Sequence, residues 1–182
     1  FIPQSIFIGL GGTFAPWVGA LVKDIHQPIL LVVPDEMQKE TITRLSRVGF
    51  DNVLGYLHGG FESWEASGKE VDTLQSVSAE VLAQQLDKDA LVFDVRKPGE
   101  YAAEHIENVT STPLDFLNDH LTEFPTNKDF YVHCAGGYRS VIAASILKAR
   151  GFRKVIDVAG GYGAIKETGI KRTQATACSN SK

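Results

Sequence analysis

Cysteine is scarce in this chain: only Cys134 and Cys178 occur among its 182 residues. Two cysteines cannot build the disulfide framework that stabilises small secreted domains, so a reducing, cytoplasmic compartment is expected. Long apolar runs are missing as well, since the longest, residues 29–33, is far too short to cross a bilayer. No secretory signal and no membrane partner are therefore expected.

A basic surface and a metal-binding motif are also missing. The formal net charge is −4, and no cluster of Lys and Arg is interleaved with aromatic residues, so a nucleic-acid partner is not expected. The histidines and carboxylates show no metal-ligand spacing such as H-E-x-x-H. The glycine pairs at 11–12 and 59–60 lack a P-loop lysine or a dinucleotide fingerprint, which indicates turns.

The chain does contain an internal similarity. Residues 29–64 and 130–162 both run apolar strand, loop, amphipathic helix, Gly-Phe, apolar strand, Gly-Gly and an aromatic residue. The offset of about 100 residues indicates duplicated domains rather than a solenoid. We expect a first copy at 1–72, a second copy at 73–172 and a polar tail at 173–182.

The second copy alternates short apolar strands with helices. Strands are expected at 91–95, 130–133 and 154–158, and helices at 79–86 and 140–150. This order predicts an α/β fold with a parallel sheet flanked by helices on both faces. Nothing in the first copy corresponds to the strand at 91–95. We therefore expect the first copy to be incomplete at its N-terminus and the chain to be a fragment of a longer protein.

The candidate chemistry lies in one loop, because Cys134 follows an apolar strand and the helix expected at 140–150 follows the loop. In open α/β sheets, ligands bind beyond the carboxyl ends of the strands. Free N–H groups at a helix N-terminus stabilise an anion such as a thiolate, which is the nucleophilic form of cysteine. Gly136 and Gly137 allow the loop to curl. Arg139 adds a planar fork of donors suited to sulfonate-like oxygens, so we expect a reactive Cys134 rather than an inert buried thiol.

The motif C-A-G-G-Y-R at 134–139 resembles the active-site loop of the rhodanese family, in which a cysteine and an arginine bracket four residues. Residues 91–106 resemble the family's strand–turn–helix signature, and residues 155–169 resemble its closing strand and Gly-Gly turn. The resemblance implies a sulfurtransferase. Its Cys134 would take sulfane sulfur from thiosulfate or a small persulfide, hold it as a persulfide, and pass it to a thiol, sulfite or cyanide acceptor.

The resemblance also implies roles for individual residues. Cys134 and Arg139 would be catalytic, Asp94 and Arg96 would support the site, and the loop between the catalytic pair would bind substrate, namely Ala135, Gly136, Gly137 and Tyr138. His133 is not expected to be catalytic, because adjacent strand residues point to opposite faces. Cys178 lies in the polar tail and is read as an incidental thiol rather than one that resolves a persulfide.

Two alternatives stay open. One is a non-catalytic rhodanese-like module for binding or regulation. The other, less favoured, is a phosphatase or arsenate reductase of the same fold, whose loop carries one more residue between cysteine and arginine. The sequence also departs from the family pattern at Glu104, where a glycine is common, and at 107–109, where Pro-Gly-Ala is common.

The first copy is expected to be degenerate. Pro34 stands at the position of Cys134, and Asp35, Glu36 and Glu40 would repel an anion. Trp17 and Trp64 are expected in a core or an interface.

A degenerate copy followed by an active one resembles the tail of bacterial proteins that join a metallo-β-lactamase-fold persulfide dioxygenase to rhodanese domains. The resemblance implies iron in a missing N-terminal domain, which would be a partner, and no cofactor in this chain. Whether the chain forms a homo-oligomer stays open.

Overall fold

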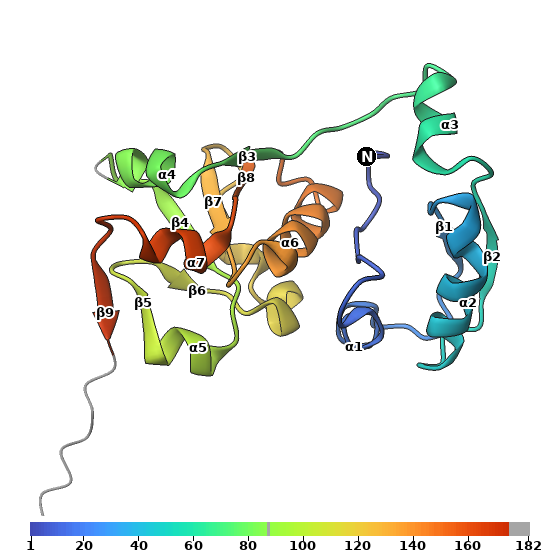
Figure 1. Ribbon diagram of the computed structural model, residues 1–182, viewed down its shortest axis with the longest axis horizontal. Coiled ribbons are helices and arrows are strands. Elements are labelled where there is room, and N and C mark those ends of the chain that lie inside the picture. Colours follow the sequence, from blue (N-terminus) through green and yellow to red (C-terminus); the bar gives the residue numbers. More distant parts are fainter. Residues whose placement is uncertain (87, 175–182) are drawn as a thin grey trace, which may run out of the picture. The chain divides into compact units, whose positions relative to one another are not determined.

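The computed structural model describes residues 1–86 and 88–174, so Cys178 lies outside the described residues. The chain divides into two compact units, Phe1–Thr73 and Leu74–Lys182. Figure 1 shows the elements of each unit. Among the described residues, no helix is both long and apolar enough to span a membrane.

The first unit is built on a two-stranded parallel sheet of β1 and β2. Its core contains Phe14, Val18, Leu31, Leu45 and Phe50. Trp17 is buried, as expected for a core residue. The elements of this unit are α1 (Phe14–Leu21), β1 (Ile29–Leu31), a short 3₁₀ helix η1 (Asp35–Met37), α2 (Gln38–Ser46), β2 (Val53–Tyr56) and α3 (Gly60–Ala66).

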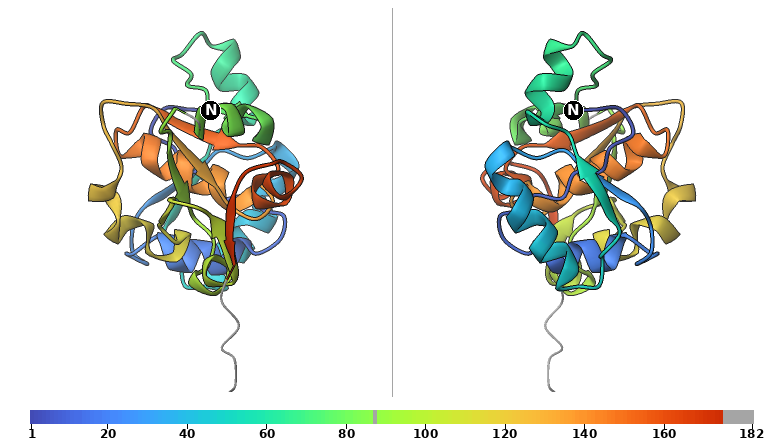
Figure 2. Two further views of the ribbon diagram at one scale, coloured as in Figure 1. Left: turned by 90° about the vertical axis from the view of Figure 1, so that its left-hand side faces the viewer. Right: turned by 90° about the vertical axis from the view of Figure 1, so that its right-hand side faces the viewer.

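The second unit contains a five-stranded sheet in the order β3-β8-β7-β4-β6, and all of its pairs are parallel. Flanking helices complete the expected α/β architecture (Figures 1 and 2). The strands are β3 (Gln75–Val77), β4 (Leu91–Asp94), β5 (Glu104–Ile106), β6 (Thr110–Ser111), β7 (Phe130–His133), β8 (Val155–Val158) and β9 (Arg172–Gln174). The helices are α4 (Ala79–Leu86), α5 (Pro98–Ala103), η2 (Leu114–Asp119), η3 (Leu121–Glu123), α6 (Tyr138–Ala149) and α7 (Gly161–Lys166).

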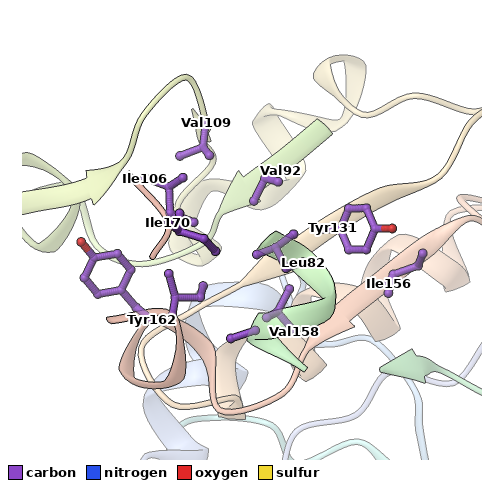
Figure 3. Packing of buried hydrophobic residues seen from close by; sticks show 11 residues of the cluster. Leu82, Val92, Ile106, Val109, Tyr131, Ile156, Val158, Tyr162 and Ile170 are labelled. Carbon is purple, nitrogen blue, oxygen red and sulfur yellow. The ribbon is translucent and has the colours of Figure 1, made fainter. Parts of the chain in front are cut away.

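Two layers of apolar side chains hold this sheet. On one face, Leu82 of α4 and Ile165 of α7 pack with strand residues such as Tyr131 and Ile156 (Figure 3). Side chains alternate along a strand, so Phe130 and Val132 point to the opposite face, toward α6. Leu82, Phe130 and Val132 have no exposed surface. Burying such a side chain stabilises the fold by about 1.5–3 kcal/mol.

The last strand closes the second unit at a distance from the main sheet. β9 pairs antiparallel with β5, with His105 opposite Thr173 (Figures 1 and 2). The Glu104 carboxylate accepts bonds from Lys166 at 2.9 Å and from Arg172 at 3.1 Å. These ion pairs lower the pKa of Glu104, chiefly through the bond from Lys166.

The two units share one local arrangement. Gly59 and Gly60 have φ angles of 73° and 57°, and Gly160 and Gly161 have φ angles of 72° and 54°. A Cβ on Gly60 would lie 3.0 Å from the carbonyl oxygen of Val33, whereas one on Gly161 would collide with the carbonyl oxygen of Cys134.

The contact of each second glycine with a carbonyl oxygen aligns Val33 of the first unit with Cys134 of the second. The sequence had placed Pro34, one residue later, at this position.

Candidate active site

Cys134 lies where the sequence places it, between the end of β7 and the start of α6. Its side chain is almost completely buried, with 1 % of its surface exposed. The backbone N–H of Gly137 donates a hydrogen bond to Sγ at 3.1 Å. The loop therefore curls back on itself within three residues and turns an amide toward the sulfur.

Gly137 makes this curl possible and begins the helix. It is the N-cap of α6 with φ of 105°, a conformation that favours glycine. Helix α6 therefore starts at Tyr138, two residues earlier than expected, and its twelve residues direct their N-terminus toward the loop. Unsatisfied N–H groups and the helix dipole both favour negative charge at this end. Ala135 and Gly136 are exposed, whereas Tyr138 is half-buried.

Helix α7 fixes the other side of the loop. The N–H of Tyr162 donates to the carbonyl of Cys134 at 2.6 Å, and the N–H of Gly163 donates to the carbonyl of Ala135 at 2.9 Å. In a trans peptide the N–H points away from the C=O, and the described chain has no cis peptide. The N–H groups of Ala135 and Gly136 consequently point away from α7. The sequence marked the Gly-Gly turn but did not reveal that it orients the loop.

Arg139 is held by a residue that the sequence analysis missed. Its two terminal nitrogens donate to the two carboxylate oxygens of Glu100 at 2.6 and 2.8 Å. Glu100 Oε2 also accepts the backbone N–H of Lys97 at 3.0 Å. The bond from Arg139 is the main cause that lowers the pKa of Glu100 to about 2. Arg139 is thus close to the loop but engaged in an ion pair.

Asp94 and Arg96 form a buried support under the site. Arg96 Nε donates to both Asp94 oxygens at 3.0 and 2.9 Å, and Nη2 donates to Oδ2 at 2.6 Å. Nη2 also donates to the Glu104 carbonyl at 2.8 Å. The guanidinium lies 3.7 Å from the Tyr162 ring centroid. Arg96 therefore connects β4, β5 and the same tyrosine whose N–H holds Cys134.

His133 faces the interior of the protein. It has no exposed surface, its Nδ1 is 3.3 Å from the Cys134 carbonyl oxygen, and its Nε2 is 3.8 Å from Asp94 Oδ2. Burial is the main cause that lowers its pKa. A neutral ring that contacts the Cys134 backbone supports the loop.

Within residues 1–86 and 88–174, no group of three or more His, Cys, Asp and Glu residues could hold a metal ion. The site contains the Cys134 sulfur, backbone donors and paired side chains.

Comparisons with known proteins agree with this geometry. The model of the rhodanese-like domain matches residues 78–168. The chain belongs to the rhodanese-like domain family. Its loop, the turn before α7 and the strands β4, β6, β7 and β8 of the main sheet lie within the matched segment, whereas β3 precedes it.

Two curated relatives handle sulfur according to their names. A putative sulfur carrier protein from Bacillus subtilis is 34% identical over 99 residues, which cover 53% of this chain and 54% of that protein. A sulfurtransferase from Allochromatium vinosum is 29% identical over 90 residues, which cover 48% of this chain and 84% of that protein. The rhodanese-like domain is thus homologous to sulfurtransferases and sulfur carriers. The chain spans about half the length of the Bacillus relative.

A solved structure confirms the fold. The rhodanese-like domain protein from Staphylococcus aureus is 31% identical, with a TM-score of 0.50. The match covers 54% of this chain and 97% of that one. The α/β rhodanese-like fold with a central parallel sheet is therefore established for this part of the chain.

Proposed function

We propose that the chain is a rhodanese-type sulfurtransferase that carries sulfane sulfur on Cys134. The donor is thiosulfate or a small persulfide, and the acceptor is a thiol, sulfite or cyanide. The observation that carries the proposal is the 3.1 Å hydrogen bond from the Gly137 amide to Cys134 Sγ at the N-terminus of α6. A loop amide at this distance donates directly to the sulfur that would carry the transferred atom.

The transfer consists of two displacements. The Cys134 thiolate attacks the outer sulfur of the donor, a new S–S bond forms, and the donor's own S–S bond breaks. Its electron pair leaves with a thiolate from a persulfide or with sulfite from thiosulfate. The acceptor then attacks the terminal sulfur of the Cys134 persulfide, which regenerates the thiolate. In this scheme the loop amides contact the sulfur, while Asp94 and Arg96 keep the loop in place.

Mass spectrometry tests this function directly. After incubation with thiosulfate or with glutathione persulfide, the protein should gain the mass of one sulfur atom on Cys134. Cys134→Ser should abolish the gain, whereas Cys178→Ser, which removes the other thiol, should retain it. A wild-type protein that gains no sulfur from either donor would refute the proposal and favour a non-catalytic binding module. Hydrolysis of an aryl phosphate that depends on Cys134 would instead favour a phosphatase.

We also propose that the first unit is a degenerate copy of the second. Both units have parallel strands followed by a Gly-Gly turn of matching φ angles. Val33 occupies the place of the nucleophile, and the Asp35 carboxylate accepts the Gly59 N–H at 2.9 Å. An acidic side chain at this turn opposes the binding of an anionic sulfur.

The resemblance of the two tandem copies to the tail of metallo-β-lactamase-fold persulfide dioxygenase fusions supports a wider role in persulfide oxidation, which we place in the cytoplasm. Iron would belong to that partner domain, and no step proposed here passes through it. Mass spectrometry of the protein from its native source would test for the partner domain.

A further inference from the structure

Arg139, the cationic residue of the loop, already forms an ion pair with Glu100. Arg139 donates to both oxygens of Glu100, and its side chain is only 16 % exposed. Paired charges of opposite sign cancel at a distance, so the attraction that Arg139 would exert on an approaching dianion is largely removed. Arg96 is paired in the same way with Asp94 and is buried.

Glu100 is held firmly in this position. Its Oε2 accepts the backbone N–H of Lys97, so the carboxylate is fixed at the first turn of α5. Two parallel bonds between a guanidinium and a carboxylate have a defined geometry and are stronger than single contacts. A sulfonate group that needs Arg139 must therefore compete with a carboxylate that the backbone already orients.

The two donor classes differ in where they carry charge. Thiosulfate is a dianion whose sulfonate oxygens need a cation near the mouth of the loop. An alkyl persulfide carries its single charge on the terminal sulfur, which becomes the transferred atom. That sulfur reaches the amides of the loop directly and needs no contact with Arg139.

We propose that Glu100 determines the donor specificity of the site: by pairing with Arg139, it makes the loop select organic persulfides over sulfonate-bearing donors such as thiosulfate. The inference rests on the sulfur transfer proposed above. With a persulfide, the Cys134 thiolate bonds to the outer sulfur and the departing thiolate takes the electrons of the broken S–S bond. No oxidant or reductant is required.

The test compares two donors by single-turnover sulfur loading. The first donor is thiosulfate, and the second is 2-hydroxyethyl persulfide, whose charge lies on the sulfur alone. Wild-type protein should load faster from the persulfide. Glu100→Gln keeps an acceptor for the Lys97 N–H but releases the charge of Arg139, so the thiosulfate to persulfide ratio of kcat/KM should rise about tenfold.

Asp129→Asn is the matched control. Asp129 is exposed and precedes β7, whereas Cys134 follows the opposite end of that strand. The substitution changes net charge by the same amount, and the donor ratio should stay at its wild-type value. If this control raised the ratio as much as Glu100→Gln, overall charge would explain the effect and the proposal would be overturned.

A double variant tests whether Glu100 acts through its partner. In an Arg139→Gln background, Glu100→Gln should no longer raise the donor ratio. An equal rise in both backgrounds would overturn the inference. If Glu100→Gln does not fold, the loading rates of the wild-type protein test the inference. Faster loading from thiosulfate than from the persulfide would overturn the inference.

The same data separate the two proposals. Absence of loading from both donors removes the sulfurtransferase function itself, whereas loading with an unchanged donor ratio in Glu100→Gln removes only the role of Glu100.

Discussion

Replacing Gly161 by alanine should damage the site without altering the Cys134 side chain. A Cβ at this position would collide with the carbonyl oxygen of Cys134 and would lie 3.0 Å from the carbonyl carbon and oxygen of Ala135. Neither neighbour is the end of a flexible side chain, so either the loop or the first turn of α7 must shift. The φ angle of 54° also disfavours alanine.

The size of the effect follows from three contributions. A non-glycine residue in the left-handed region costs about 1 kcal/mol. The shift would weaken the bonds from Tyr162 and Gly163 to the loop carbonyls, each of which contributes about 1 kcal/mol. We therefore expect Gly161→Ala to lower the free energy of unfolding by about 3 kcal/mol. Sulfur loading should fall because the loop amides no longer meet the sulfur correctly.

Gly151→Ala provides the matched control. Gly151 has a φ angle of 95°, but nothing lies within 4 Å of a Cβ built there. The free energy of unfolding of Gly151→Ala should fall by about 1 kcal/mol from backbone strain alone, and this variant should load sulfur normally. Urea denaturation and single-turnover loading measure the two quantities. If Gly161→Ala and Gly151→Ala had the same free energy of unfolding and the same rate of sulfur loading, the argument that α7 orients the loop would be wrong.

Two further predictions concern pH. Arg139 lowers the pKa of Glu100 to about 2 from 4.5, so the ion pair stabilises the fold above pH 4.5 and loses its contribution as the pH falls toward 2. Because the Glu100 side chain is 36 % exposed, solvent screening reduces this contribution to about 1 kcal/mol. In urea denaturation, Glu100→Gln should be less stable than wild type by that amount at neutral pH, and the gap should close near pH 2. A gap that does not change with pH would contradict the argument. Burial lowers the pKa of His133, so the unfolded chain binds the proton first and stability should fall as the pH drops below about 6.5. His133→Gln should reduce this slope in the same assay, and an unchanged slope would contradict the assignment.

The sequence predicted those parts of the site that are contiguous in the chain. Apolar runs bounded by charged or glycine residues predicted β4, β7 and β8, and the loop motif placed Cys134 between a strand and a helix. Helix α6 begins earlier than predicted because Gly137 adopts a left-handed conformation. Apolar periodicity does not report a backbone conformation of this kind.

Contacts between distant residues were not predictable in the same way. Glu100 and Arg139 are 39 residues apart, and nothing in their local spacing pairs them. Glu100 lies in the first turn of a helix, where the helix dipole alone explains an acidic residue. Its sequence position therefore gives no sign of the ion pair with Arg139. The alignment of Val33 with Cys134 depends on the approach of Gly60 to the Val33 carbonyl, and the order of residues alone does not reveal such a contact.

The antiparallel pairing of β9 with β5 has a practical consequence for preparing this domain. The matched family segment ends at residue 168, whereas the strand that braces Glu104 begins at Arg172. A fragment that ends at residue 168 would lack the ion pair between Arg172 and Glu104. It would also lack the pairing of β9 with β5, the strand whose Glu104 carbonyl accepts a hydrogen bond from Arg96. A recombinant fragment intended to preserve the nucleophile's surroundings should therefore extend at least to residue 174.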